Sequence, residues 1–284
     1  MSRSPDLTVI QRETTFRAPD GIELFRRSWQ PPGVTRGVLL NVHGLGDHSG
    51  LYPSLTDHFV ARGWALHALD LRGNGRSPGA RGHIRHWSVY RADLAGFLDV
   101  VRAEEPNRPL FLLGHSLGGL LVLDFALAHP EGLRGVIAAA PPLGTVGTPA
   151  WLLGLGRVLS RVWPTLALET GLDLSGLSRD PVTRDAVLAD PLFHRRGSAR
   201  LAAELLAAAA RVRRAAQFPV PLLLLHGGAD RMVLPDGTRA FFAQVAQPDK
   251  RLIEYPEAFH ALFADLDRAR VLADLEAWMV ARAG

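Results

Sequence analysis

Cysteine is absent from all 284 residues of the chain, and lysine occurs once, as Lys250. The absence of cysteine excludes disulfides, thiolate nucleophiles and cysteine-ligated metal sites. It does not by itself decide the compartment, because both reducing and oxidising locations tolerate a chain without thiols. Nearly all the positive charge is therefore carried by arginine, which keeps its proton at any physiological pH.

Long hydrophobic runs are also missing. No stretch of about 20 uninterrupted apolar residues occurs, which disfavours a membrane span. The first residues, MSRSPDLTVIQRETTF, lack the apolar segment of a secretory signal. We therefore expect a cytoplasmic protein, with peripheral contact at a membrane left open.

A dense basic stripe interleaved with aromatic residues is the third absence, and it argues against nucleic acid as a partner. The formal net charge is only +4, with acids dispersed among the arginines. Mild attraction to an anionic membrane surface is compatible with this balance. The sequence gives no prediction of an oligomeric state.

What is present is enough apolar material, 47% of the residues, for one large core. After a predicted hairpin over 14–30, short apolar runs alternate with helical patterns. The runs are GVLLNVHG, ALHALDLRG, LFLLGHS, GVIAAAPP, VPLLLLHGGAD and RLIEYP. This alternation predicts an α/β fold with a mostly parallel, doubly wound sheet.

The alternation stops over residues 143–216, which show helical stretches and no buried strand. We expect a core made of 1–142 and 217–284, and a helical cap over 143–216 inserted after the sixth strand. In WLLGLGRVLSRVW, apolar residues from Trp151 to Val162 follow helical spacing. That helix either packs on the core or offers a surface to lipid or to an acyl chain, and both roles are compatible.

Ser116 lies between an apolar strand and a predicted helix in the segment Gly114-His115-Ser116-Leu117-Gly118. This G-x-S-x-G pattern is typical of a nucleophile elbow, a strained turn that exposes a serine hydroxyl at a helix N-terminus. The alternative is an ordinary strand-to-helix turn with a serine cap. The strand before it and the helix after it favour the nucleophile.

A serine nucleophile needs a base, and the base needs an orienting acid. On folds with this elbow the order along the chain is Ser, Asp or Glu, His. His260 is the histidine that follows the late strands, in PEAFHALF, and Asp230 directly follows the strand VPLLLLHGG. Ser116, Asp230 and His260 are thus the predicted triad, against the simpler interpretation of a turn aspartate and a loop histidine. The acids set aside are Asp124, Asp173, Asp180, Asp185 and Asp190.

Acyl transfer also needs donors for the developing oxyanion. The backbone N–H groups of Leu117, after the nucleophile, and of Leu45, in the glycine-rich loop HGLG, are the candidates. His43 and His48 lack a third ligand at metal-site spacing, so no metal is expected. His115 and His226 are expected to be structural neighbours. DLRGNGRS lacks the lysine of a phosphate loop and is expected to shape the edge of the cleft.

Taken together, HGLGDHSGLYPSL, ALDLRGNGRSPGARG, LFLLGHSLGG, LLLLHGGAD and FHALF resemble the monoacylglycerol lipase and lysophospholipase-like branch of the α/β-hydrolases. The resemblance runs from about residue 14 to 282 and includes DPLFHRRGSARLAAELL. It implies a serine hydrolase with a helical cap and no cofactor, acting on long-chain monoacylglycerols or related esters. One departure is Leu51-Tyr52, where the family usually has Arg-Tyr.

We therefore expect a hydrolase of fatty-acid esters with a lipid-like small molecule as its partner and transient membrane contact through the cap. A lysophospholipase, a general carboxylesterase or thioesterase, and a peptidase on the same fold are the enzymatic alternatives. A ligand-binding protein that has kept the pocket without the chemistry is the non-enzymatic one.

Overall fold

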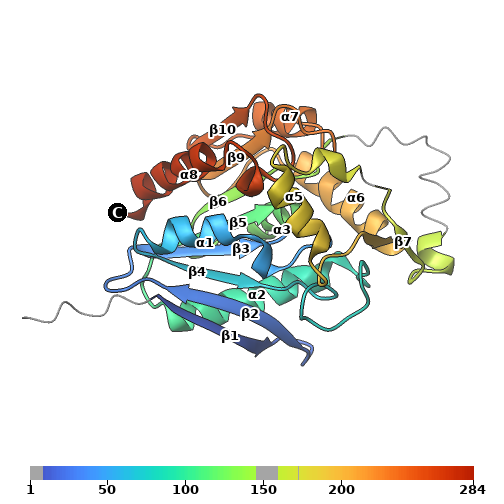
Figure 1. Ribbon diagram of the computed structural model, residues 1–284, viewed down its shortest axis with the longest axis horizontal. Coiled ribbons are helices and arrows are strands. Elements are labelled where there is room, and N and C mark those ends of the chain that lie inside the picture. The colour runs from blue at the N-terminus through green and yellow to red at the C-terminus, as the bar shows by residue number, and fades with distance from the viewer. Residues whose placement is uncertain (1–8, 145–158, 172) are drawn as a thin grey trace, which may run out of the picture.

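The structure, a computed structural model, describes residues 9–144, 159–171 and 173–284. Its main sheet has eight strands in the order β1-β2-β4-β3-β5-β6-β9-β10, seen from bottom to top in Figure 1. The strands are β1 (Ile10–Arg17), β2 (Glu23–Gln30), β3 (Gly37–Val42), β4 (Trp64–Leu69), β5 (Leu110–His115), β6 (Leu133–Ala139), β9 (Leu222–Gly227) and β10 (Lys250–Tyr255).

Strand directions agree with the predicted α/β architecture. β1 and β2 form the expected antiparallel hairpin, and β2 pairs antiparallel with β4. Every other neighbouring pair, from β4 through β3, β5, β6 and β9 to β10, is parallel. The carboxyl ends of these parallel strands share one edge, which is where open α/β sheets hold their sites.

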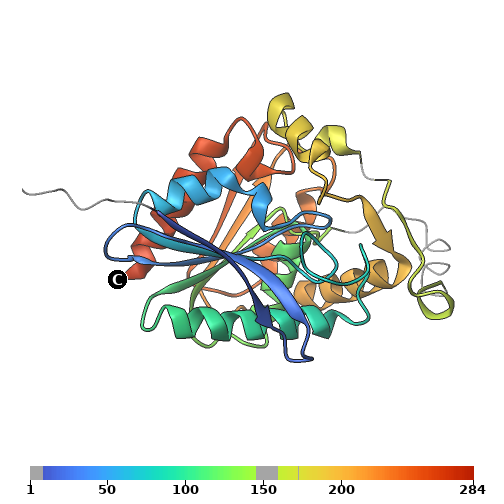
Figure 2. The ribbon, with the colours of Figure 1, turned by 60° about the horizontal axis from the view of Figure 1, so that its bottom comes forward.

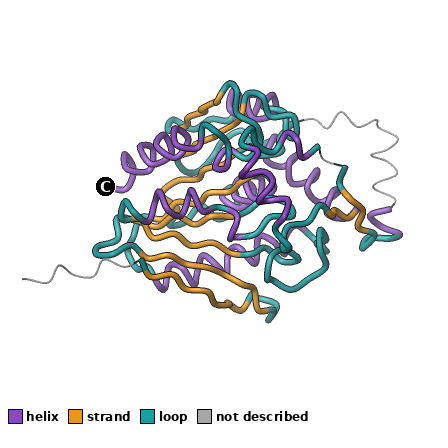
Figure 3. The backbone as a smooth tube through the Cα atoms, viewed as in Figure 1, coloured by secondary structure: helices purple, strands orange, loops and turns teal. Residues whose placement is uncertain are grey.

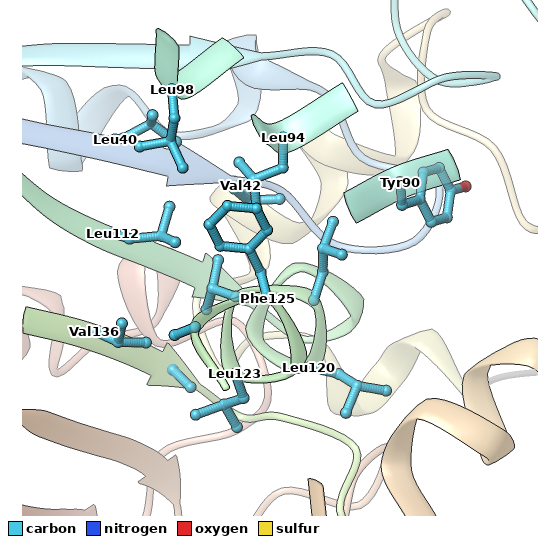
Figure 4. Packing of buried hydrophobic residues seen from close by; sticks show 14 of the residues in the cluster. Leu40, Val42, Tyr90, Leu94, Leu98, Leu112, Leu120, Leu123, Phe125 and Val136 are labelled. Atoms are coloured by element: carbon cyan, nitrogen blue, oxygen red, sulfur yellow. The ribbon is translucent and has the colours of Figure 1, made fainter. Parts of the chain in front are cut away.

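Helices cover both faces of the sheet, as Figure 2 shows. α1 (Pro53–Val60) and α8 (Arg268–Ala283) lie on one face, and α2 (Trp87–Glu104) and α3 (Leu117–Ala126) lie on the other; α7 (Asp236–Gln244) follows β9. Successive residues of a strand point to opposite faces. Leu40 therefore packs toward α2 and α3, as Figure 4 shows, whereas Leu39 belongs to the cluster under α1 and α8.

Residues 143–216, which we call the insertion, connect β6 to β9 as predicted. Beyond the helical residues 159–162 they contain η2 (Leu174–Gly176), α5 (Pro181–Ala189) and α6 (Ala199–Arg213). The division into a core and a cap stays a prediction. The apolar pattern from Trp151 lies largely outside the described residues.

The insertion also contains a small sheet that the sequence analysis did not predict. β7 (Ala167–Glu169) pairs antiparallel with β8 (Arg196–Ser198) and forms a second, two-stranded sheet. Each strand has three residues and most of them are exposed or half-buried. A strand this short shows no detectable alternation of polar and apolar residues, so the sequence pattern does not reveal it.

The described part of the insertion lies beyond the carboxyl ends of the parallel strands (Figure 1). Figure 3 shows loop segments between those strand ends and the insertion. Within the described ranges, none of the helices combines the length and the apolar character needed to cross a bilayer.

Candidate active site

Ser116 occupies a tight turn between β5 and α3. Its backbone has φ 54° and ψ −118°, in a region that residues other than glycine rarely adopt. A Cβ atom on Gly114 would lie 2.2 Å from the carbonyl oxygen of Gly118, and one on Gly118 would lie 2.2 Å from that of Val42. A side chain at either position would collide with the backbone, so both positions require glycine. The two glycines thus allow the tight turn that the sequence predicts.

His260 and Asp230 are brought together by the loops that follow β10 and β9. Nδ1 of His260 donates a hydrogen bond to Oδ2 of Asp230 over 2.7 Å. The other carboxylate oxygen, Oδ1, accepts the backbone N–H groups of Met232 at 2.8 Å and Val233 at 2.9 Å. Because Nδ1 is engaged with the carboxylate, Nε2 is the imidazole nitrogen left to face a substrate or the hydroxyl of Ser116.

Burial and charge set the protonation of this pair. Burial lowers the pKa of His260 below its usual value, and the hydrogen bond and charge of Asp230 only partly oppose this. Burial would raise the pKa of Asp230, but hydrogen bonds from His226 and His260 outweigh it and the pKa lies well below the usual range. At neutral pH the pair is therefore a neutral imidazole beside a carboxylate, the state that a general base requires.

His226, expected to be a structural neighbour, supports the loop that carries Asp230. Its ring is fully buried, and its Nε2 donates to the backbone oxygen of Val233 over 2.9 Å while Nδ1 accepts from Oγ1 of Thr238, also at 2.9 Å. The same Nε2 lies 3.4 Å from Oδ2 of Asp230. The ring thus fixes the turn of the loop and adds a favourable dipole near the carboxylate.

The glycine-rich loop after β3 lies against the nucleophile. Nε2 of His43 accepts the backbone N–H of Leu71 at 2.8 Å, and its Nδ1 donates to the carbonyl oxygen of Gly44 at 2.7 Å. Burial lowers the pKa of His43, in agreement with this neutral form. Both nitrogens are used to hold the loop, so His43 has a structural role. Leu45 lines the cavity beside Ser116, while Leu117 is the first residue of α3.

A polar network that the sequence reasoning missed joins this loop to the base. The hydroxyl of Tyr52 donates to Oδ2 of Asp47 at 2.9 Å and accepts the N–H of Gly44 at 3.2 Å. Burial, and then the charge of Asp47, raise the pKa of Tyr52 well above its usual value. His115 connects the two parts: its Nδ1 lies 3.2 Å from the hydroxyl oxygen of Tyr52, and its Nε2 donates to the backbone oxygen of His260 at 3.2 Å. The motif containing Asp47 and Tyr52 was visible, but their convergence on the site was not.

A cavity of about 550 Å³, counting the part open to solvent, contains Ser116 and His260 in its wall. Its wall combines apolar side chains, including Met232 and Val233 from the loop after β9, with polar and charged ones such as Asp47 and His115. The insertion supplies Thr170, Leu174, Leu177, Phe193, His194 and Arg195. The sequence did not identify these lining residues, because nothing in their local pattern says which side chains face the core.

Residues set aside on sequence grounds have other partners. Asp124 binds Arg211 through two hydrogen bonds of 3.0 and 3.1 Å, away from the triad candidates. In DLRGNGRS, Asp70 accepts the backbone N–H groups of Ser49 at 2.7 Å and Arg76 at 2.8 Å. These contacts fix the shape of the loop itself; none of residues 70–77 lies in the cavity wall, and their role at the edge of the cleft stays a prediction.

The chain is similar to known hydrolases over nearly its whole length. A family model described as serine aminopeptidase, S33, matches residues 33–267. A monoacylglycerol lipase of Mycolicibacterium smegmatis is 32% identical over 277 residues, 96% of this chain and 99% of the relative. The monoglyceride lipase of Homo sapiens is 32% identical over 286 residues, 99% of this chain and 94% of the relative.

A solved structure gives the same likeness in three dimensions. The crystal structure of Paleococcus ferrophilus monoacylglycerol lipase aligns with a TM-score of 0.82 at 34% sequence identity. The alignment covers 92% of this chain and all of that one. The sheet, its helices and part of the insertion therefore share one architecture with a solved hydrolase.

Proposed function

We propose that this chain, which belongs to the serine aminopeptidase S33 family of α/β-hydrolases and is an ester hydrolase, cleaves fatty-acid esters with Ser116 as its nucleophile. The observation that carries the proposal is the 2.7 Å hydrogen bond between His260 and Asp230, beside a cavity that Ser116 shares with His260. Monoacylglycerols are the proposed substrates.

The reaction has two halves. His260 takes the hydroxyl proton of Ser116 on Nε2 as Oγ bonds to the ester carbonyl carbon, and Asp230 stabilises the resulting imidazolium. The carbon–oxygen bond to the alcohol then breaks, and the leaving oxygen takes that proton. Water next attacks the acyl-enzyme and gives its proton to His260. When the carbon–Oγ bond breaks, the proton returns to the serine and the fatty acid leaves.

The backbone N–H groups of Leu45 and Leu117 are the proposed oxyanion donors. Leu117 starts α3, so its N–H lies among the first helical donors, which have no partner within the helix. Leu45 is held in place by the contacts of His43 and Tyr52 with the neighbouring Gly44. Preorganised donors of this kind stabilise the charge that develops on the carbonyl oxygen.

The apolar part of the cavity wall, which includes Leu45, Met232 and Val233, favours contact with an acyl chain. Burial of each methylene contributes about 0.8 kcal/mol, so about ten buried methylenes supply the roughly 8 kcal/mol of micromolar binding, before the cost of association is subtracted. The insertion would act as the cap over this chain. The expected transient membrane contact stays a prediction; exposed Val162 and Trp163 in the insertion could make it, and co-sedimentation with lipid vesicles tests it.

Ser116→Ala tests the mechanism. We expect this variant to lose turnover of a p-nitrophenyl ester and labelling by a fluorophosphonate probe, while its thermal unfolding stays close to that of the parent. Ser88→Ala, the same change at an exposed position on α2, is the control and retains both. Unchanged turnover by Ser116→Ala contradicts the proposed nucleophile, and a parent chain that does not react with the probe favours the non-catalytic binding protein.

Substrate choice is tested separately. Monoacylglycerols of increasing chain length are compared with lysophospholipid, short esters, thioesters and an aminoacyl anilide. The proposal expects kcat/KM to be highest for a long-chain monoacylglycerol. Preference for the lysophospholipid, or for the aminoacyl anilide, assigns the enzyme to the corresponding alternative.

A further inference from the structure

The loop that carries His260 is held by the insertion through its backbone. The N–H of His260 donates to the carbonyl oxygen of Gly176 at 3.3 Å, and the N–H of Ala261 donates to that of Leu177 at 2.8 Å. Gly176 ends η2 in the insertion. The imidazole of the proposed catalytic base is thus held by Asp230 in the core, while its backbone is held by His115 in the core and by Gly176 in the insertion.

A buried ion pair lies directly behind these two hydrogen bonds. Asp265 is fully buried, and its Oδ2 accepts the backbone N–H groups of Phe259 at 3.2 Å and Arg179 at 3.0 Å. Its Oδ1 accepts the N–H of Leu266 at 2.7 Å and Nε of Arg179 at 2.7 Å. Nη2 of Arg179 also reaches Oδ2 of Asp267 at 2.7 Å. One carboxylate therefore joins both ends of the loop around His260 to a single residue of the insertion.

The opposite charges of Arg179 and Asp265 make this contact depend on both residues. Burial would raise the pKa of Asp265, but the guanidinium of Arg179 and the backbone donors outweigh it, and the pKa is lowered. The side chain of Arg179 is only 18% exposed. Removing one partner of such a pair leaves the other charge buried without compensation, so the loop has to rearrange to bring that charge to water.

We propose that Arg179 is a positioning residue for His260, acting through Asp265 to fix the loop of residues 259–266 against the insertion. The inference rests on the proposed function, because it takes His260 as the base. Arg179 is absent from the cavity wall as the described residues form it. Its contribution is therefore to the orientation of the imidazole, and substrate binding does not depend on direct contact with it.

Kinetic constants and NMR spectra distinguish this positioning role from a general contribution to folding. A base displaced by about 1 Å can lose on the order of 100-fold in rate, even when the substrate is bound normally. The loss should then appear in kcat, with KM little changed. It should also disturb the hydrogen-bonded proton on Nδ1 of His260, which gives a downfield proton resonance in NMR spectra when the imidazole is held against Asp230.

The test compares Arg179→Met with Arg211→Met. Arg211, on α6, also links the insertion to the core through two hydrogen bonds to a buried acid, Asp124, of 3.0 and 3.1 Å. It does not contact the loop of residues 259–266, so it is a matched control. We expect Arg179→Met to lower kcat by on the order of 10- to 100-fold and to shift or broaden the resonance. Arg211→Met should keep both near the parent values.

Equal effects of the two variants, or a loss confined to KM with an unchanged resonance, overturn the proposal.

If Arg179→Met does not fold, Arg179→Lys is the variant that tests the role of Arg179. Its ammonium can pair with Asp265 but cannot hold Asp265 and Asp267 with the same fork of donors, so kcat should fall to an intermediate value. A parent-like kcat refutes the role. Ser116→Ala, measured in parallel, separates the outcomes: if it retains turnover the proposed function fails, while the resonance still reports whether Arg179 positions His260.

Discussion

Replacing Asp230 by asparagine changes the proton on His260 with little change of shape. Oδ1 of Asp230 accepts two backbone N–H groups, at 2.8 and 2.9 Å, whereas Oδ2 accepts Nδ1 of His260 at 2.7 Å. An asparagine keeps its oxygen on the two backbone donors and so presents its NH₂ to His260. Nδ1 must then accept a hydrogen bond, and the proton of the neutral imidazole moves to Nε2.

A base protonated on Nε2 cannot take the proton of Ser116. In serine protease triads the same substitution leaves the imidazole in the wrong tautomer and lowers kcat by about 10⁴-fold, which corresponds to about 5.4 kcal/mol at about 1.36 kcal/mol per factor of ten. We expect a loss of similar size here. Because both backbone hydrogen bonds to the side chain oxygen are retained, the free energy of unfolding should change far less than the activation free energy.

The assay is kcat for a p-nitrophenyl ester, with ¹⁵N chemical shifts of the imidazole reporting the tautomer. Asp236→Asn, the same change on the exposed first turn of α7, is the control and should leave kcat unaltered. A loss of less than about tenfold in Asp230→Asn, with Nε2 shown to carry the proton, would refute the reasoning, because the tautomer would then not limit the reaction.

Two further results are expected. Since burial lowers the pKa of His260 below its ordinary 6.5, kcat/KM for an uncharged ester should be constant at neutral pH and fall only as the pH drops through a midpoint below 6.5; a midpoint above 7 contradicts the neutral base. In Gly46→Ala, φ is +76° and the new Cβ would lie 1.8 Å from the carbonyl oxygen of His194, whereas in Gly21→Ala, at φ +87°, no atom lies within 4 Å. Urea unfolding should show about 1–2 kcal/mol of destabilisation for Gly21→Ala and more for Gly46→Ala. Only Gly46→Ala should also lose activity. Equal destabilisation of the two variants would mean that the contact with His194 causes no strain.

The sequence was sufficient to predict the sheet and the positions of the triad candidates along it. The short apolar runs that alternate with helical patterns marked the strands of the main sheet, and the loops after β5, β9 and β10 were therefore expected at one edge. The match of Gly114 and Gly118 to the elbow motif also predicted the tight turn at Ser116. These patterns involve residues that are close together in the chain, so they can be recognised in a single sequence.

The wall of the cavity could not be predicted in the same way. Phe193 and His194 line the cavity from the insertion, far along the chain from Ser116. Tyr52, which precedes α1, does not line it but binds the neighbouring loop through the N–H of Gly44. The pairing of Arg179 with Asp265 spans 86 residues. Neither partner stands out locally, because charged residues on loops are usually solvated, and the folded chain alone shows that this carboxylate is buried.

The ion pair between Arg179 and Asp265 also limits how freely the insertion can be exchanged. A chimera that transplants a foreign segment between β6 and β9, in order to accept a new ester, would remove the guanidinium and leave a carboxylate stranded inside the core. Such a graft must bring its own cation to the same spot, or carry Asp265 changed to a neutral residue. A change of substrate selectivity through the insertion therefore has to treat Arg179 and Asp265 together, although they lie 86 residues apart in the chain.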